Sequence, residues 1–339
     1  MNEHSRREFL CRALPGAAVA GAGLTMLRPW VSLAADAQLT PGKAERSYTA
    51  GKYALEIDGQ FAGWLESAEG GHATSDVVGE KAERESIQRK HIAGVKYEDI
   101  TVTCGAGMSR NFYEWIRASL DKQYSRKSGA LIACDYDFRE MSRTEWSNAL
   151  ITEVGFPACD AASKDAAKMT IKFSPETTRM STRTGASAGG VYSGGLKAQV
   201  QKKWLPANFR LQIAGLEAAC TRVNKIEAIV VKQVASAGAP RWQVSNLVVT
   251  LPERDADLFS KWHEESVKGG AGAGKETGGT LVYLTPDLKE HIFTLTFRGL
   301  GISKLIPEKV EAGSENIRRV KAEMYCQDIA FAHGPAAWG

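Results

Sequence analysis

A strand–loop–helix pattern occurs twice in this chain, at a constant spacing. In residues 96–120, apolar residues alternate with polar ones up to Cys104, and the buried face of a helix follows two glycines. Residues 246–267 repeat this order without a gap, so that Trp115 corresponds to Trp262. A pattern that recurs in this way predicts a tandem duplication. It therefore limits the fold to two small similar modules.

Other segments of the chain extend the repeat. Residues 53–59 and 209–215 share an alternating strand pattern, and Asp58-Gly59 is a hairpin-turn dipeptide. Farther along, an offset of 150 aligns Gly129, Leu131, Glu140, Thr144, Leu150 and Pro157 with Gly279, Leu281, Glu290, Thr294, Leu300 and Pro307. Lys168-Met169 aligns with Arg319-Val320 at an offset of 151. The fold class that we predict is mainly β, with one short helix in each of two tandem antiparallel sandwich or barrel modules.

The repeat and the composition set the domain boundaries. Residues 38–180 form the first predicted module and residues 201–339 the second. The intervening residues 181–200 are rich in Ser, Thr, Gly and Ala, which is typical of a flexible linker. Trp115 and Trp262 lie on the apolar faces of the two predicted helices, so we expect both in the module cores rather than in ligand stacking.

Residues 1–37 have the order of elements of a twin-arginine export signal. Arg6 and Arg7 precede Phe9 and Leu10, a weakly apolar run follows, and Ala35-Asp36-Ala37 forms a cleavage site. The apolar run over 14–27 is shorter than the ~20 residues that a membrane span needs. The signal predicts passage through the twin-arginine translocase, a periplasmic or extracellular location, and no stable membrane insertion.

Charge and cysteine content restrict the function further. The formal net charge is +4 and the basic residues are scattered, which does not favour nucleic-acid binding. Cys104, Cys134, Cys159, Cys220 and Cys326 follow the signal, and none forms a C-x-x-C pair. An odd number at wide spacing is no disulfide framework, so these residues are expected to pack in the cores.

No motif for catalysis or for a cofactor stands out. Residues 269–275 match half of a phosphate-binding loop, but the expected Ser or Thr is absent and the loop follows a helix instead of a strand. Asp135, Asp137 and Glu140 could do acid–base work, although turn formation is the commoner role of such residues. His263 has no second His at helical spacing. We predict no enzyme, no metal and no cofactor.

Two stretches of the first module resemble the tail tube proteins of contractile phages. They are IAGVKYEDITV at 92–102 with FYEWI at 112–116, and the strands over 150–173. The resemblance implies a β-sandwich or barrel with one flanking helix, as in the haemolysin-co-regulated proteins of type VI secretion. It also implies that six modules close into a ring through joined sheet edges and that rings stack into a hollow tube. The predicted function is that of a structural, self-assembling protein.

The duplication leaves the assembly and its alternatives open. If both modules occupy ring positions, three chains give six modules, with the arm over 66–89 alternating with a shorter one over 221–241. One alternative is an exported monomer with two β-sandwich domains that bind a peptide or a carbohydrate. A third hypothesis is an exported enzyme with its site between the modules.

Replacing both Arg6 and Arg7 with lysine is expected to leave the uncleaved precursor in the cytoplasm, because the arginine pair defines the twin-arginine signal. Immunoblotting of cell fractions measures the precursor and the processed chain. Arg12→Lys is the matched control, since it makes the same replacement outside the pair. Normal processing in cells that lack the twin-arginine pathway would contradict the assignment.

Overall fold

The computed structural model describes residues 51–80, 89–182, 204–234, 240–268, 276–309 and 317–338. These residues belong to one compact unit, Tyr48–Gly339. The predicted export signal with Arg6, Arg7, Phe9, Leu10, Ala35 and Ala37 lies outside the described residues, as do most of the predicted linker and the segment 269–275. Within the described ranges, no helix is both long enough and apolar enough to span a membrane.

The described residues of the first half form thirteen strands and one helix. They are β1 (Lys52–Ile57), β2 (Gln60–Leu65), β3 (Ser67–Gly70), β4 (Ala73–Thr74), β5 (Val77–Glu80), β6 (Arg89–Ile92), β7 (Lys96–Tyr97), β8 (Ile100–Cys104), α1 (Arg110–Leu120), β9 (Lys127–Cys134), β10 (Glu140–Phe156), β11 (Cys159–Asp160), β12 (Met169–Ser174) and β13 (Thr177–Thr182). Asp58 and Gly59 both have positive φ, as the predicted two-residue turn between β1 and β2 requires.

The second half shares the order of its main strands and of its long helix with the first half. It comprises β14 (Phe209–Ile213), α2 (Glu217–Cys220), β15 (Lys225–Ile226), β16 (Ile229–Val234), β17 (Arg241–Val244), β18 (Leu247–Pro252), η3 (Glu253–Asp255), α3 (Asp257–Lys268), β19 (Thr277–Leu284), β20 (His291–Pro307), β21 (Arg319–His333) and η4 (Pro335–Ala337). The mainly β fold class is therefore confirmed, with the one-turn helix α2 as an addition that the repeat did not predict.

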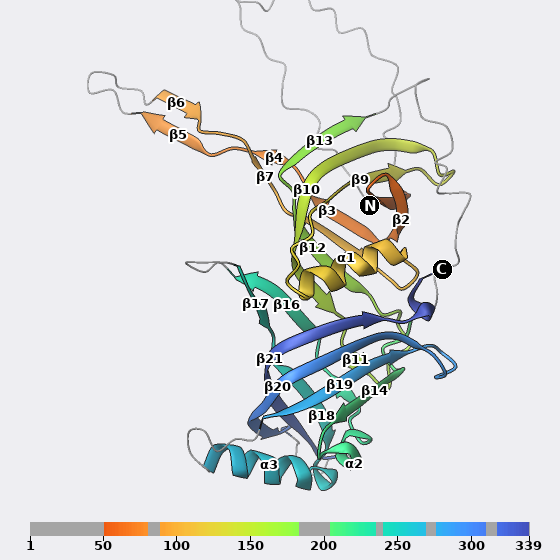
Figure 1. Cartoon of the computed structure of the whole chain (residues 1–339), viewed down its shortest axis with the longest axis vertical. Coiled ribbons are helices and arrows are strands. Elements are labelled where there is room, and N and C mark those ends of the chain that lie inside the picture. The colour runs from red at the N-terminus through yellow and green to blue at the C-terminus, as the bar shows by residue number, and fades with distance from the viewer. Residues whose placement is uncertain are drawn as a thin grey trace, which may run out of the picture. The chain divides into compact units, whose positions relative to one another are not determined.

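The two halves have the same sheet topology. The strand order β1-β9-β10-β12-β8-β3 in the first half corresponds to β14-β19-β20-β21-β18-β15 in the second. Figure 1 shows β19, β20 and β21 of the second sheet side by side. Every recorded strand pair is antiparallel, and each large sheet is accompanied by the helix that follows β8 or β18. The common order is the structural counterpart of the repeat in the sequence.

The register of one ladder supports the repeat residue by residue. In β8 and β12, Val102 pairs with Ile171, and in β18 and β21, Val249 pairs with Ala322. The offsets in sequence are 147 for the first strand and 151 for the second, as the alignment predicts. Irregularities recur at the same place, between Ile151 and Glu153 in β10 and between Ile302 and Lys304 in β20.

One part of the predicted alignment is wrong by a single residue. Glu140 pairs with Cys134 at the start of β10, whereas His291, not Glu290, pairs with Leu284 at the start of β20. The offset along these strands is therefore 151, and Leu150 corresponds to Gly301. The turn between β19 and β20 is one residue longer than the turn between β9 and β10, and this shifts every later position.

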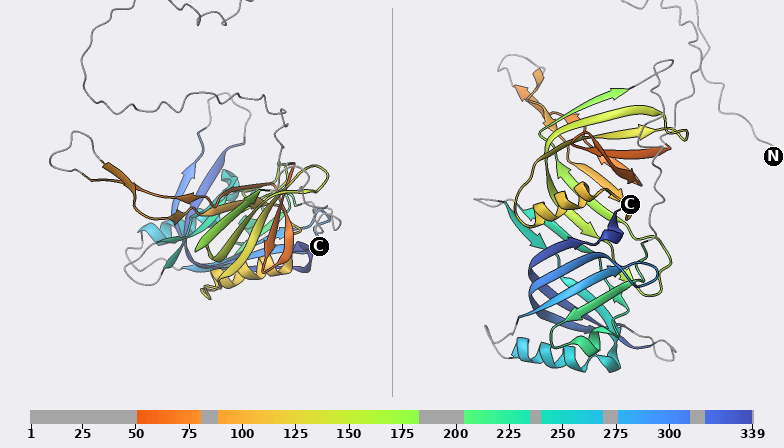
Figure 2. Two further views of the ribbon diagram at one scale, coloured as in Figure 1. Left: turned by 90° about the horizontal axis from the view of Figure 1, so that it is seen from above. Right: turned by 45° about the vertical axis from the view of Figure 1, so that its right-hand side comes forward.

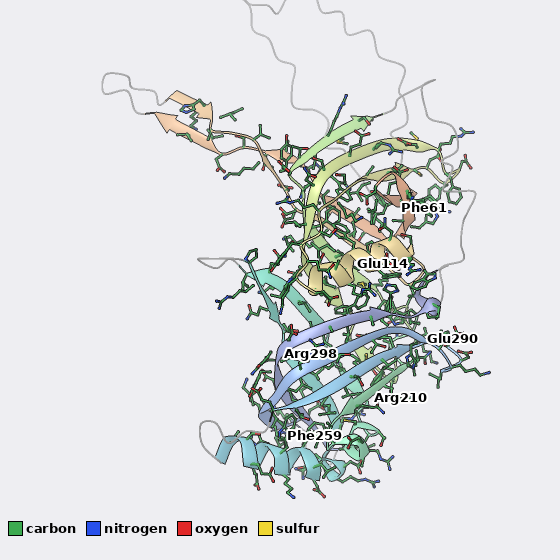
Figure 3. The ribbon with its side chains drawn as sticks, in the orientation of Figure 1. Phe61, Glu114, Arg210, Phe259, Glu290 and Arg298 are labelled. Atoms are coloured by element: carbon green, nitrogen blue, oxygen red, sulfur yellow. The ribbon has the colours of Figure 1, made fainter. Side chains whose placement is uncertain are left out.

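Local sequence accounts for α1. Ser109 caps the helix, because its Oγ accepts a hydrogen bond from the backbone N–H of Phe112 at 3.3 Å. Trp115 is 1% exposed, donates from Nε1 to the carbonyl of Ser125 at 2.8 Å, and stacks on Trp146. At the equivalent place on α3, Trp262 is 9% exposed, one turn from the fully buried Phe259. Figure 3 labels Phe259 beside α3.

The halves share one core. Tyr113 of α1 lies 5.1 Å, between ring centroids, from Phe293 of β20, and Phe156 of β10 lies 5.5 Å from Phe331 of β21. All four rings belong to a single cluster of buried residues that includes both sheets. The two repeats consequently pack as one body of buried apolar side chains.

Trp115→Ala is expected to lower the free energy of unfolding by about 3–5 kcal/mol, because it deletes a buried aromatic side chain and leaves a cavity. Denaturant unfolding followed by circular dichroism measures the change. Tyr136→Ala is the control, since that ring is 72% exposed. Equal losses in both variants would contradict a core role for Trp115.

Candidate functional site

The carboxylates predicted as acid–base candidates lie at the turn between β9 and β10, and Asp135 stabilises this turn. The carboxylate of Asp135 accepts hydrogen bonds from the backbone N–H groups of Asp137 at 2.9 Å and Arg139 at 2.8 Å. Glu140 is 7% exposed and pairs with Arg143 at 2.9 Å. In the described ranges, no group of three or more His, Cys, Asp or Glu side chains is placed to hold a metal ion. The carboxylates of this turn thus order the connection between β9 and β10.

The cysteines are free thiols, and four of the five are buried. Burial raises the pKa of Cys104 and of Cys159 to about 12, and the pKa of Cys134 and of Cys220 to about 11. At neutral pH these thiols stay protonated, so they lack the thiolate that nucleophilic or metal-binding cysteines need. They act as small apolar core residues.

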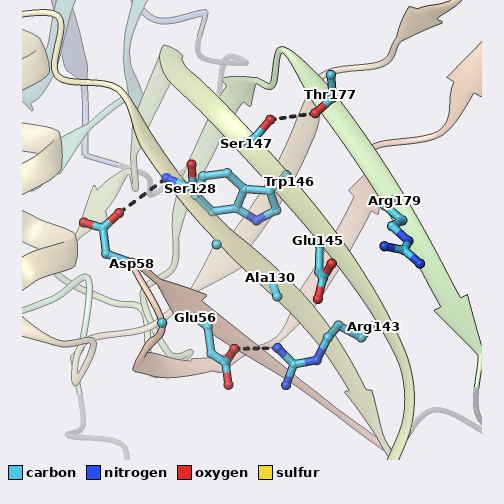
Figure 4. A pocket seen from close by; sticks show the side chains of 12 residues that line it. Glu56, Asp58, Ser128, Ala130, Arg143, Glu145, Trp146, Ser147, Thr177 and Arg179 are labelled. Atoms are coloured by element: carbon cyan, nitrogen blue, oxygen red, sulfur yellow. Dashed lines mark hydrogen bonds and ion pairs between the residues drawn. The ribbon is translucent and has the colours of Figure 1, made fainter.

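A hollow of about 480 Å³ lies over β1, β9, β10 and β13 (Figure 4). At its edge, Arg143 binds Glu56 at 2.6 Å and Glu140 at 2.9 Å. Its hydrogen bonds to Glu140, and secondly to Glu56, raise the pKa of Arg143. Arg143 thus links β10 to β1 across the intervening strand β9, and its ion pairs neutralise only part of the charge of the two carboxylates.

The arm of the first half is one hairpin made of two short strand pairs. Ala73 pairs with Tyr97 at the base, β5 pairs with β6 at the tip, and the backbone N–H of Ala93 donates to the carbonyl of Asp76 at 2.9 Å. Both views in Figure 2 show β5 and β6 extending away from the large sheets. The side chains of Val77 and Ile92 are 66% and 71% exposed. Val77 and Ile92 pair directly across β5 and β6, so they form an exposed apolar pair on the arm.

The counterpart hairpin in the second half, β16 with β17, is not exposed in this way. Its strand β16 adds to the edge of β10, where Val231 pairs with Val154 and Ile229 with Phe156. These four side chains are at most 1% exposed. We expected the segment over 221–241 to be only a shorter arm; in the structure it also closes the sheet of the first half. The apolar run Ile229–Val231 was the one sequence signal of this pairing.

His333 lies where the two halves meet. Its ring centroid is 4.7 Å from that of Trp338 and 5.7 Å from that of Tyr113 on α1. Among the described residues, neither ring nitrogen has a hydrogen-bond partner. Burial lowers the pKa of His333, and the nearby Arg117 and Arg110 lower it further while Glu114 opposes them. The folded protein consequently favours the neutral form of this ring.

The stability of the protein is expected to fall as the pH drops below about 6.5, the ordinary histidine pKa. The folded-state pKa of His333 is the lower one, so the unfolded chain takes up the proton first and is favoured. Above the unfolded-state pKa the contribution is fully present. Denaturant titrations at several pH values should show a smaller decrease for His333→Phe than for the unmodified chain. An identical pH profile for that variant would contradict the role of His333.

Part of the chain is similar to a known protein family. Residues 49–179 match the family model described as T4-like virus tail tube protein gp19. No curated protein matches the chain. The fold resembles solved structures at low identity, among them the anti-feeding prophage cap (AFP tube terminating cap), with 19% identity, 41% of this chain and 93% of that chain covered, and a TM-score of 0.37.

Two further structures cover similar shares of the chain. The sheath/tube terminator of an extracellular contractile injection system, PVC, shows 18% identity, covers 41% of this chain and 99% of that chain, and has a TM-score of 0.37. Hcp1 from Flavobacterium johnsoniae shows 13% identity, covers 38% of this chain and 96% of that chain, and has a TM-score of 0.27. Over residues 49–179 the chain is thus phage tail tube-like.

Proposed function

We propose that this chain is a structural protein that assembles with its own copies into rings or tubes, as a tail tube-like component of a contractile injection system. The observation that carries the proposal is the match of residues 49–179 to the tail tube family model. The second half has the same strand order as this matched half, so the chain supplies two units of the tail tube-like topology.

The way in which the halves join supports assembly rather than catalysis. The halves connect by adding β16 to the edge of β10, which is a contact between sheet edges. A chain built from two units through such a contact carries a pattern that further copies can repeat. The buried thiols and the ion-paired carboxylates described above form no comparable basis for an enzyme.

The proposed stoichiometry is three chains in each ring of six modules, with true threefold symmetry. Because the two modules of a chain are linked covalently, each has a high effective concentration for the other, and a ring needs fewer encounters. The exposed arm over β5 and β6 occurs only in the first half of the described chain, so successive junctions in such a ring are unequal.

The proposed place of assembly is outside the cytoplasm. The support is the ordered set of signal elements in residues 1–37. The twin-arginine route carries folded chains, and the proposed rings then form from folded chains after export. The alternative of an exported monomer that binds a peptide or a carbohydrate predicts a single chain in solution.

Removing the tip of the arm is expected to abolish rings or their stacking while the chain stays folded. Asp76 and Ala93 are already joined by a backbone hydrogen bond of 2.9 Å, so an Asn-Gly turn can replace residues 77–92. Mass photometry measures the particle size, negative-stain imaging shows rings, and circular dichroism measures folding. Deleting only the tip keeps β3, which pairs with β8 inside the sheet.

Tyr136→Ser is the matched control, since it removes an exposed aromatic side chain away from the arm. It should leave assembly unchanged. A monomeric unmodified chain at high concentration would contradict the proposed function and favour the binding-module alternative. Assembly that persists without the tip would remove β5 and β6 from the mechanism.

A further inference from the structure

The junction inside the chain is one continuous antiparallel ladder. The first-half strands β10 and β11 lie against the second-half strands β16 and β15. Glu153 pairs with Lys232 at one end and Asp160 with Lys225 at the other, in a single register. The ladder therefore defines which residues of one half meet which residues of the other.

The repeat identifies the first-half counterpart of β15 and β16. Lys225 pairs with Thr250 in the second half, and Ser67 pairs with Thr103 in the first. Since Thr103 and Thr250 are related by the offset of 147, Ser67 corresponds to Lys225. Beyond this point, Val231 pairs with Val244 as Ala73 pairs with Tyr97, again at the same offsets. The segment from β3 to β4 is consequently the counterpart of the strand that closes the junction.

The repeat also identifies the second-half counterpart of the β10 edge. With the offset of 151, Glu153 and Val154 correspond to Lys304 and Leu305 in β20. In the described part of the chain, β20 beyond Leu300 pairs only with β21. In the same described residues, β4 pairs with β7 along one edge, and its other edge has no partner strand. The described residues of each chain thus present one open edge of each kind.

The exposure of the side chains agrees with an open edge. Phe156 is 1% exposed in the closed junction, whereas its counterpart Pro307 is exposed, and so is the neighbouring Ile306, at 50%. His72, Ala73 and Thr74 are likewise exposed. An exposed strand edge with apolar side chains is a template for pairing with another chain.

On the premise of the proposed self-assembly, we propose that residues 72–74 of one chain add as a strand to the β20 edge of a second copy. The register follows from the junction inside the chain, with Thr74 opposite Lys304, Ala73 opposite Leu305 and His72 opposite Ile306. The contact is heterologous, because different edges of the two copies meet, so it propagates from chain to chain until a ring closes.

The backbone of the arm is oriented for this contact. The carbonyl of His72 accepts from the backbone N–H of Glu98 at 3.0 Å, so His72 uses its polar groups inside the arm. In an antiparallel ladder the backbone N–H and C=O groups of successive residues point to opposite sides of the strand. The N–H of Ala73 therefore points away from β7. The counterpart of Ala73 is Val231, which pairs with Val154 of β10 in the closed junction.

Cysteine cross-linking of the full chain tests the register. Residues directly opposite in antiparallel strands have Cα separations that suit a disulfide. A chain carrying Thr74→Cys and Lys304→Cys should form disulfide-linked multimers on oxidation, with the two cysteine peptides joined between chains. The pair Glu153→Cys and Lys232→Cys, from the closed junction, is the positive control and should link within one chain.

An out-of-register pair and a backbone variant complete the test. Thr74→Cys with Lys309→Cys, also exposed, should give no interchain disulfide. Ala73→Pro removes the outward N–H and should lose the multimers, whereas Ala73→Ser keeps the N–H and should retain them. Native circular dichroism of the proline variant establishes that the chain is folded.

The outcomes separate this inference from the proposed function. Rings in which the Thr74 and Lys304 cysteines never join would overturn the register and leave the proposed function standing. Cross-linking of these two positions within a single chain would overturn it as well. An unmodified chain that stays monomeric at every concentration would overturn both proposals.

Discussion

Strand addition between β10 and β16 is the contact on which the rest of this structure depends. It buries Val154 and Phe156 against Val231 and Ile229, and it brings the aromatic rings of both halves into one cluster. Without it, each half would present a row of unpaired backbone groups beside an incomplete core. The register proposed for the contact between two copies is taken from the same contact.

Much of the fold could be predicted because it depends on local sequence patterns. Alternation at residues 100–104 and 247–251, the Ser109 cap and the Asp58-Gly59 turn all depend on near neighbours in sequence. The repeat then related the two halves to each other. It was wrong by one residue in β20, because a turn longer by one residue shifts register without changing the apolar pattern.

The candidate site was less predictable because its partners are distant in sequence. The run Ile229–Val231 indicates a strand, but nothing local shows that its partner is the end of β10 rather than another edge. For the same reason His333 gave no signal, since its contacts with Tyr113 on α1 form only when the halves pack together. Long-range pairing is decided by the whole arrangement of edges and not by one segment.

The junction also has a consequence for synthesis. The chain emerges N-terminus first, so the end of β10 leaves the ribosome about 70 residues before β16, which is several seconds at ~5–20 residues per second. During that interval the edge around Val154 and Phe156 has no partner from its own chain. On the predicted twin-arginine route, this interval falls in the cytoplasm before export.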